Sequence, residues 1–214
     1  MFEKFKAELL QAFTQPLPGK EAHELLKPYL KINKNLDAPR LPNAKSGAVI
    51  SLIYPIDSIP HILFIERPVY DGVHSGQIAF PGGKIEKEDA SVLDAALRET
   101  WEEIGVEISQ IRVAGPLTEV YVLASNFIVY PFVGLLDELP ALTLDQKEVA
   151  DTLAIPLYRF FEPTVIKEKP MRNALGFNLM APYYDLDGKV LWGATAMMVS
   201  ELCDIIRKHQ IALR

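Results

Sequence analysis

The sequence contains very little cysteine, since Cys203 is the single thiol among 214 residues. One cysteine cannot form an internal disulfide or a cysteine-based zinc site. Because Cys203 lies in the apolar-periodic run AMMVSELCDIIRK, we expect it to be a buried structural thiol. The composition therefore excludes a disulfide scaffold and a zinc finger.

Long apolar runs and excess positive charge are also missing. The opening segment MFEKFKAELLQAF mixes charged and apolar residues, unlike a signal peptide or a membrane span. The closing IALR matches no retention or peroxisomal address. The formal net charge of −6 gives no electrostatic footprint for nucleic-acid binding. We therefore expect a cytoplasmic protein that binds neither nucleic acid nor a membrane, and whose anionic ligands need local positive charge.

The first 46 residues differ in pattern from the rest of the chain. Residues 2–13 predict an amphipathic helix, and a second short helix is expected before Pro28. Residues 31–46 are polar, contain two prolines and predict a loop. We interpret residues 1–46 as an N-terminal helical extension, whose apolar surface could pack on the core or on a second copy in a homodimer.

Short β-branched runs begin at Gly47. GAVISLIYPI and HILFIERP, separated by DSIP, predict a hairpin. Further strands are expected in GQIAFP, IRVAGPLTEVYVL, NFIVYPFVGLL, EVADTLAIPL and a hairpin turned at LDG, with Pro131 indicating an edge or a bulge. Helices are expected near 89–104 and 194–208. This pattern predicts an α/β sandwich with a mixed sheet over residues 47–214.

The helix expected near 89–104 carries the acidic residues. At about 100° per residue, Glu99, Glu102 and Glu103 fall on one face. The opposite face is the expected core stripe, formed by Leu93, Leu97, Trp101 and Ile104. The three carboxylates repel one another. They form either a solvated acidic face or an oxygen-rich site for Mg²⁺ or Mn²⁺, zinc being disfavoured because no His or Cys cluster is present.

The residues that flank this helix support the second interpretation. Asp89 or Ser91 can cap its start, and Gly105 stands where a left-handed residue ends a helix. The preceding turn FPGG contains glycines, which let backbone approach a ligand closely. A strand, a glycine turn and an acidic helix could together hold a metal ion against a phosphate chain.

These residues resemble the Nudix hydrolase box, in which Gly and Glu precede Arg-Glu-aliphatic-x-Glu-Glu-x-Gly-aliphatic. The second half is present as RETWEEIGV at 98–106, with Thr100 in place of an aliphatic residue. The loop in the first half is slightly long, so the first acid is matched by one of Glu86, Glu88 and Asp89. The resemblance implies a Nudix-type α/β/α sandwich and a pyrophosphohydrolase that uses water and divalent cations.

The stretch HSGQIAFPGG is similar to the extended signature of the Nudix branch that cleaves coenzyme A. The matching positions are Arg67, Gly76, Gln77, Phe80, Pro81, Gly82 and Gly83. The intervening PVYDGVHS differs from the commonest version, whereas later segments such as NFIVYPFVG and LWGATAMMVSEL are also similar. The resemblance covers about residues 47–208 and implies release of 3′,5′-ADP and 4′-phosphopantetheine from coenzyme A or its derivatives.

The resemblance also implies roles for the box residues. Glu99, Glu102 and Glu103 would hold one or more Mg²⁺ or Mn²⁺ ions, with the carbonyl of Gly83 as a further ligand. Arg98 would orient one of these carboxylates. The ions would neutralise the diphosphate and lower the pKa of bound water.

The general base and the substrate contacts stay open. A box glutamate or Glu148 could be the base, although Glu148 could equally be a surface residue before a strand. Arg67 and Lys84 could bind the 3′-phosphate, but Arg67 could instead form a salt bridge at a strand end. Gln77 and His74 could contact substrate or hold the loop. Four aromatic residues could either stack on adenine or pack in the core: Tyr70, Phe127, Tyr183 and Trp192.

Two other functions compete with a coenzyme A diphosphatase. One is a Nudix hydrolase for ADP-ribose, dinucleotides or oxidised nucleotides, and the other is a Nudix-like domain that binds a nucleotide without cleaving it. The intact REXXEE pattern argues against the binding domain, which has no need of three metal-binding acids. The stretch GQIAFPGG favours coenzyme A over the other substrates.

Overall fold

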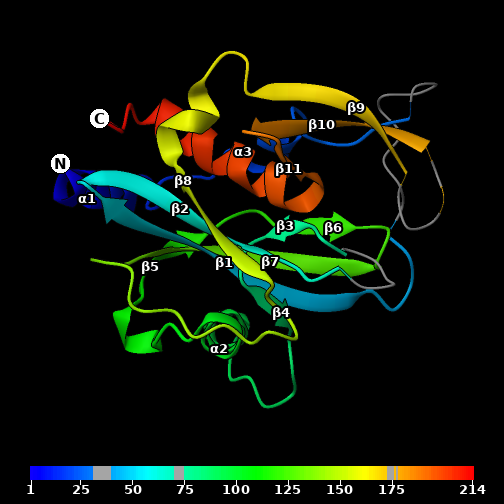
Figure 1. Ribbon diagram of the computed structural model, residues 1–214, viewed down its shortest axis with the longest axis horizontal. Coiled ribbons are helices and arrows are strands. Elements are labelled where there is room, and N and C mark those ends of the chain that lie inside the picture. The colour runs from blue at the N-terminus through cyan, green and yellow to red at the C-terminus, as the bar shows by residue number, and fades with distance from the viewer. Residues whose placement is uncertain (31–39, 70–74, 173–175, 177) are drawn as a thin grey trace.

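The computed structural model describes residues 1–30, 40–69, 75–172, 176 and 178–214 (Figure 1). Three α-helices and eleven strands are described, together with 3₁₀ helices. In chain order they are α1 Phe2–Ala12, η1 Gly19–His23, β1 Lys45–Ile56, β2 Ile59–Glu66, β3 Ile78–Ala79, β4 Gly82–Lys84, α2 Val92–Ile104, η2 Ile108–Gln110, β5 Arg112–Pro116, β6 Val120–Val122, β7 Phe127–Leu135, β8 Asp151–Pro156, η3 Leu157–Phe161, β9 Ile166–Arg172, β10 Asn178–Leu186, β11 Lys189–Trp192 and α3 Gly193–Lys208.

The larger sheet is mixed and is centred on β1. Its main order is β3-β2-β1-β7-β5, and β4, β6 and β8 pair with β1, β7 and β2 respectively. β1 runs parallel to β7 and antiparallel to β2 and β4. The predicted β1–β2 hairpin is confirmed, and its turn places Asp57 and Ser58 at φ 51° and 65°, as a tight hairpin turn requires.

Alternation along the central strands divides the core into two layers. Ile50, Leu52 and Tyr54 of β1 face α2, whereas Ile53 belongs to the cluster that includes residues of α1 and α3. Figure 1 shows α2 on one side of the sheet, and α3 with the strands β9, β10 and β11 on the other. The expected α/β sandwich with a mixed sheet is therefore confirmed. Within the described residues, no helix is long and apolar enough to cross a membrane.

The second sheet, in the order β11-β10-β9, contains one strand that the sequence pattern did not predict. The sequence of β9, IKEKPMR, is charged and includes Pro170. It forms a strand because it occupies an edge, where a missing N–H donor is tolerated. The predicted hairpin of β10 and β11 is confirmed, with its turn at Asp187 and Gly188.

The N-terminal segment packs on the core. The predicted helix is α1, and its Phe2, Phe5 and Leu9 are buried in the cluster that also contains α3 residues. The second expected helix is the short 3₁₀ helix η1, whose His23 is buried. The division at residue 46 and a homodimer both stay predictions.

The structure contradicts the expectation for Trp101 and one of the two alternatives for Pro131. Trp101 was expected in the core stripe of α2, but it is 50% exposed. The helix instead buries small and polar residues, including Ala96, Thr100 and Glu103, against the sheet. Pro131 does not mark an edge, because β7 lies between β1 and the pair β5 and β6. It is tolerated because it falls where the partner of β7 changes from β6 to β5. The bulge alternative is not excluded, since the β5–β7 pairing shifts register between Val113 and Gly115.

The close contact between β4 and β1 yields a stability prediction. Gly82 has φ +140°, and a Cβ added there would lie 2.3 Å from the carbonyl oxygen of Ala48. We expect Gly82→Ala to lower the free energy of unfolding by about 2 kcal/mol or more. Gly188→Ala is the matched control, because Gly188 also has positive φ (+90°) but a Cβ would meet no atom within 4 Å. The free energy of unfolding of Gly188→Ala should fall by only about 1 kcal/mol. If urea unfolding gave the same loss for Gly82→Ala and Gly188→Ala, the close contact at Gly82 would be contradicted.

Candidate active site

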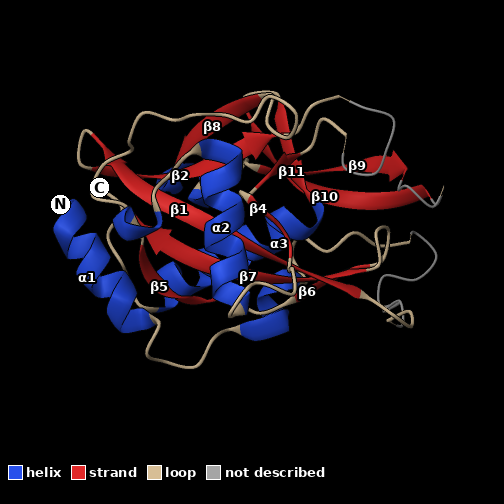
Figure 2. Ribbon diagram, turned by 90° about the horizontal axis from the view of Figure 1, so that it is seen from below, coloured by secondary structure: helices blue, strands red, loops and turns tan. Residues whose placement is uncertain are grey.

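The acidic helix α2 lies across the sheet face formed by β1 and β4 (Figure 2). Its start is capped by Ser91, whose Oγ accepts a hydrogen bond from the Asp94 N–H at 3.1 Å. Its end is Gly105 with φ 73°, the left-handed conformation expected from the sequence. The cap is therefore the second of the two candidates, and Asp89 has another role.

Glu103 is a buried carboxylate at the contact between α2 and β4. It is 1% exposed, and its Oε2 accepts a hydrogen bond from the Gly82 N–H at 2.8 Å. The other oxygen, Oε1, is buried without a hydrogen-bond partner among the described residues. Arg67 Nη2 lies 3.8 Å from it. A carboxylate in this position is incompletely compensated, which is costly in a protein interior.

Neighbouring negative charges add to this imbalance. Burial raises the pKa of Glu103 to about 7; the Gly82 N–H and Arg67 oppose the shift, and the charges of Glu148 and Glu99 increase it. Burial also raises the pKa of Glu99, against the opposing effect of Arg98, and the charges of Glu102 and Glu148 add to the rise. Glu148 itself is exposed. The structure thus brings the candidate base Glu148 electrostatically close to two box carboxylates.

Arg98 joins the box acids to the preceding loop. Its Nε and Nη2 donate to the two carboxylate oxygens of Asp89 at 2.8 and 3.1 Å. Its Nη1 donates to Glu99 at 3.1 Å and to Glu102 at 2.9 Å, and Nη2 also donates to the carbonyl of Lys84. The hydrogen bonds from Arg98 are the main reason that the pKa of Asp89 is lowered. Of the three loop acids left open by the sequence, Asp89 is the one held by Arg98.

The glycine turn leaves space for Glu99. A Cβ added at Gly83 would lie 2.4 Å from Glu99 Oε2, so a larger residue would displace that carboxylate. Glu102 is differently placed, because its side chain is 47% exposed and bonded to Arg98. In the part of the chain that is described, no three His, Cys, Asp or Glu side chains form a ready-made metal site. The ligand set of Glu99, Glu102, Glu103 and the Gly83 carbonyl stays a prediction.

The predicted substrate residues lie in different places. Arg67 Nη2 donates to the Gly82 carbonyl at 3.4 Å and faces Glu103, so it forms the strand-end ion pair that the sequence allowed as an alternative. Lys84 is exposed on β4. The carbonyl of Gln77 accepts from the Arg67 N–H, while Gln77 lines a cavity of about 380 Å³ beside the second sheet. His74 and Tyr70 lie outside the described residues.

Sequence comparison gives the family. The NUDIX domain profile matches residues 46–175. The chain belongs to the Nudix family. A Yersinia enterocolitica relative named "Uncharacterized Nudix hydrolase NudL" is 31% identical over 144 residues, covering 67% of this chain and 72% of the relative. A Yersinia pestis protein of the same name is 30% identical over 161 residues, covering 75% of this chain and 78% of the relative. The protein is thus a Nudix hydrolase, a pyrophosphohydrolase, as the box implied.

Solved Nudix structures share the fold. The Nudix hydrolase RenU from M. smegmatis superposes with a TM-score of 0.54 at 14% identity, covering 77% of this chain and 87% of RenU. A MutT/nudix family protein from Enterococcus faecalis superposes with a TM-score of 0.52 at 13% identity, and the match covers 80% of this chain and 66% of that protein. At these identities the likeness concerns the fold alone, and it confirms the predicted Nudix-type sandwich.

The Nudix box fits a divalent cation chemically. Glu103 Oε1 is an orphaned buried acceptor, and two adjacent carboxylates have raised pKa values. A cation would compensate both, and carboxylate oxygens are the ligands that Mg²⁺ and Mn²⁺ prefer. Glu99, Glu102 and Glu103 are the residues that would hold it.

The raised pKa of Glu103 predicts a pH dependence of stability in the metal-free protein. Below pH 4.5 the group is protonated in both states, and between 4.5 and about 7 only the unfolded state has lost the proton. The free energy of unfolding should therefore fall as pH rises through this window, by about 3 kcal/mol at most, relative to Glu103→Gln. Urea unfolding of wild type and Glu103→Gln, in the presence of a chelator and at several pH values, measures the difference in their free energies of unfolding. If that difference did not change with pH, the burial of this carboxylate would be contradicted.

Proposed function

We propose that this Nudix hydrolase cleaves the diphosphate bond of coenzyme A, or of a derivative, with Mg²⁺ or Mn²⁺ as cofactor. The products would be 3′,5′-ADP and 4′-phosphopantetheine. The observation that carries the proposal is the stretch GQIAFPGG. Its Gly82 N–H donates to the buried box carboxylate of Glu103, and its Gln77 lines a cavity beside the second sheet. One segment thus connects the hydrolytic residues with a pocket large enough for part of a nucleotide.

Each residue of the site has a distinct task in this proposal. Glu99 and Glu103 lie against β4 and would hold the cation, whose chemistry is to neutralise the diphosphate and acidify water. Arg98 fixes Glu99 and Glu102 relative to the loop through Asp89. Glu148 is exposed, and its charge raises the pKa of half-buried Glu99 and of buried Glu103, so we propose it as the general base.

A substrate panel tests the function. The protein would be incubated with Mg²⁺ or Mn²⁺ and with coenzyme A, ADP-ribose or a dinucleoside polyphosphate, and the products separated by chromatography. We expect 3′,5′-ADP from coenzyme A and no product in the presence of a chelator. Hydrolysis of ADP-ribose without any turnover of coenzyme A would overturn the substrate assignment. No hydrolysis of any compound would overturn the proposed activity.

The assignment of Glu148 has its own test. Glu148→Gln should lower kcat for coenzyme A by about 10²–10⁴-fold if the side chain transfers a proton in the rate-limiting step. The acidic limb of the pH–kcat profile should also disappear. Glu138→Gln is the control, because Glu138 is exposed in the same loop region before β8. An unchanged profile in Glu148→Gln would place the base elsewhere.

A further inference from the structure

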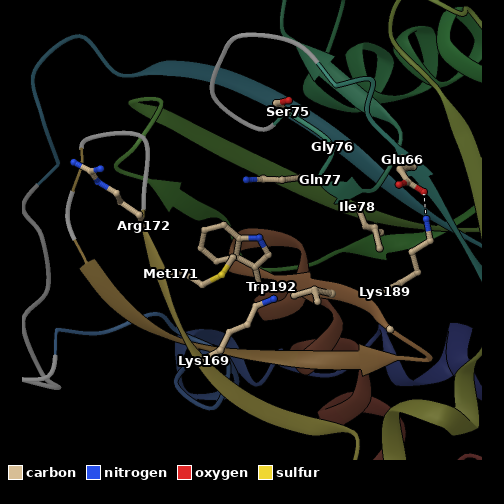
Figure 3. A pocket seen from close by; sticks show the side chains of 12 residues that line it. Glu66, Ser75, Gly76, Gln77, Ile78, Lys169, Met171, Arg172, Lys189 and Trp192 are labelled. Carbon is tan, nitrogen blue, oxygen red and sulfur yellow. Dashed lines mark hydrogen bonds and ion pairs between the residues drawn. The ribbon is translucent and has the colours of Figure 1, made fainter.

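A cavity of about 380 Å³ lies between the end of β3 and the second sheet (Figure 3). We call it the β3–β9 cavity, and its main lining residues are Gln77, Ile78, Lys169, Met171, Lys189 and Trp192. In Figure 3, Gln77 and Ile78 lie on one side, and Lys169, Met171 and Trp192 lie across from them. Two consecutive residues at the end of β2 belong to the two places, since Glu66 lines the cavity and Arg67 lies 3.8 Å from Glu103.

Strand alternation explains why Lys169, Met171 and Trp192 share one face of the second sheet, whereas Lys189 belongs to the opposite face of β11 and reaches the cavity from the turn before it. Lys169 and Met171 of β9 are half-buried, whereas the intervening Pro170 is exposed. Trp192 pairs across the sheet with Tyr183, and Lys169 Nζ lies 5.0 Å from the centre of the Tyr183 ring. The opposite face of the sheet carries buried residues that pack toward α3, including Tyr184 and Leu191. Met171 and Trp192, on the other face, do not belong to this core cluster.

The charge of the lining is unusual for this chain. Lys169, Arg172 and Lys189 stand against the single carboxylate of Glu66, in a protein with a formal net charge of −6. Glu66 is already paired with Lys189. Among the described residues, no carboxylate lies in ion-pair distance of Lys169, although the charge of Lys169 helps to lower the pKa of Asp185. Arg172 Nε donates to the Gly176 carbonyl, and in Figure 3 the Arg172 side chain points away from Trp192. Lys169 is thus a cation on the face of Trp192 without a close carboxylate partner among the described residues.

We propose that the β3–β9 cavity binds the phosphorylated adenosine end of coenzyme A, an inference that rests on the proposed function. Adenine would stack on Trp192, because aromatic rings and nucleobases attract each other face to face. Lys169 would bind the 3′-phosphate through a charge-assisted hydrogen bond. The pantetheine end of the same substrate is uncharged and has no need of a cation. Neither residue expected from the sequence for this phosphate lines the cavity: Arg67 is engaged with Gly82 and Glu103, and Lys84 is exposed on β4.

The test compares two substrates that differ only in the 3′-phosphate. KM and kcat would be measured for coenzyme A and for 3′-dephospho-coenzyme A with wild type and Lys169→Gln. The variant should raise KM for coenzyme A about tenfold or more, and leave KM for the dephospho compound within about twofold of wild type. Lys208→Gln, an exposed lysine at the end of α3, is the control. An equal change for both substrates, or no change for coenzyme A, would overturn the assignment.

A binding measurement separates this inference from the proposed function. The chain contains two tryptophans, so Trp101→Phe leaves Trp192 as the single indole reporter. We expect 3′,5′-ADP to quench its fluorescence saturably, and Lys169→Gln in this background to weaken binding about tenfold. Such binding would support the cavity even in a protein that cleaves no coenzyme A. Turnover of coenzyme A without any quenching by 3′,5′-ADP would leave the function standing and overturn the cavity assignment.

Discussion

Glu103→Gln is expected to lower kcat for diphosphate hydrolysis by about 10²–10³-fold, the loss typical of removing one preorganised charged group from an active site. The variant should remain folded, because the amide oxygen can still accept the Gly82 N–H that Glu103 Oε2 accepts at 2.8 Å. It should be at least as stable as the metal-free wild type at pH 7, since an incompletely compensated buried charge has been removed. Steady-state kinetics together with urea unfolding measure both effects.

Glu88→Gln is the matched control for this substitution. Glu88 is an exposed acid of the loop before α2, and the structure places Asp89, not Glu88, against Arg98. The control should keep wild-type kinetics. If Glu103→Gln had a lower free energy of unfolding than wild type as well as a lower kcat, the carboxylate would have a structural role. That result would contradict its assignment to the reaction.

Glu201→Ala is expected to cause the largest loss of stability, about 3–5 kcal/mol. Glu201 is fully buried in α3 and accepts hydrogen bonds from His23 Nε2 at 3.0 Å and from the Gly19 N–H at 3.2 Å. It also accepts from the Thr118 N–H and hydroxyl at 2.9 and 2.6 Å. Although burial raises the pKa of Glu201, the hydrogen bonds from His23 and Thr118 outweigh it and lower that pKa. Alanine would leave all these donors buried without an acceptor.

Asp204→Ala is the control on the same helix. Asp204 forms an ion pair with Arg207 at 3.4 Å near the surface, and such a pair contributes about 1 kcal/mol or less. Thermal and urea unfolding would compare the two variants, and limited proteolysis would report whether residues 1–30 detach in Glu201→Ala. Equal losses in the two variants would contradict the view that Glu201 fastens the N-terminal segment to the core.

The elements that could be predicted from the sequence are those with local signals. The β1–β2 hairpin, the caps Ser91 and Gly105, and the helices α2 and α3 each follow from turn residues, capping residues and periodicity within a few positions. The Nudix box was recognisable for the same reason, because its acids are close in sequence. Local patterns are sufficient where the physical cause is itself local.

The features that were not predicted depend on contacts between distant segments. Trp101 has the spacing of a core residue, yet the sheet needs small residues such as Ala96 beneath α2, and Glu103 is buried there instead. The hydrogen bond between Glu201 and His23 joins residues far apart in sequence and leaves no local pattern. The alternation of Lys167, Lys169 and Met171 was an available signal for β9, but Pro170 argued against a strand.

Binding of Mn²⁺, followed by electron paramagnetic resonance, tests most directly whether the buried carboxylates of α2 form a cation site. Wild type, Glu103→Gln and Glu88→Gln would be titrated at a pH above 7, where Glu103 is ionised in the folded state. We expect wild type and Glu88→Gln to bind the ion with the same affinity, and Glu103→Gln to bind it about 10–100-fold more weakly. Equal Mn²⁺ affinity in wild type and Glu103→Gln would contradict the assignment of Glu103 as a metal-binding residue.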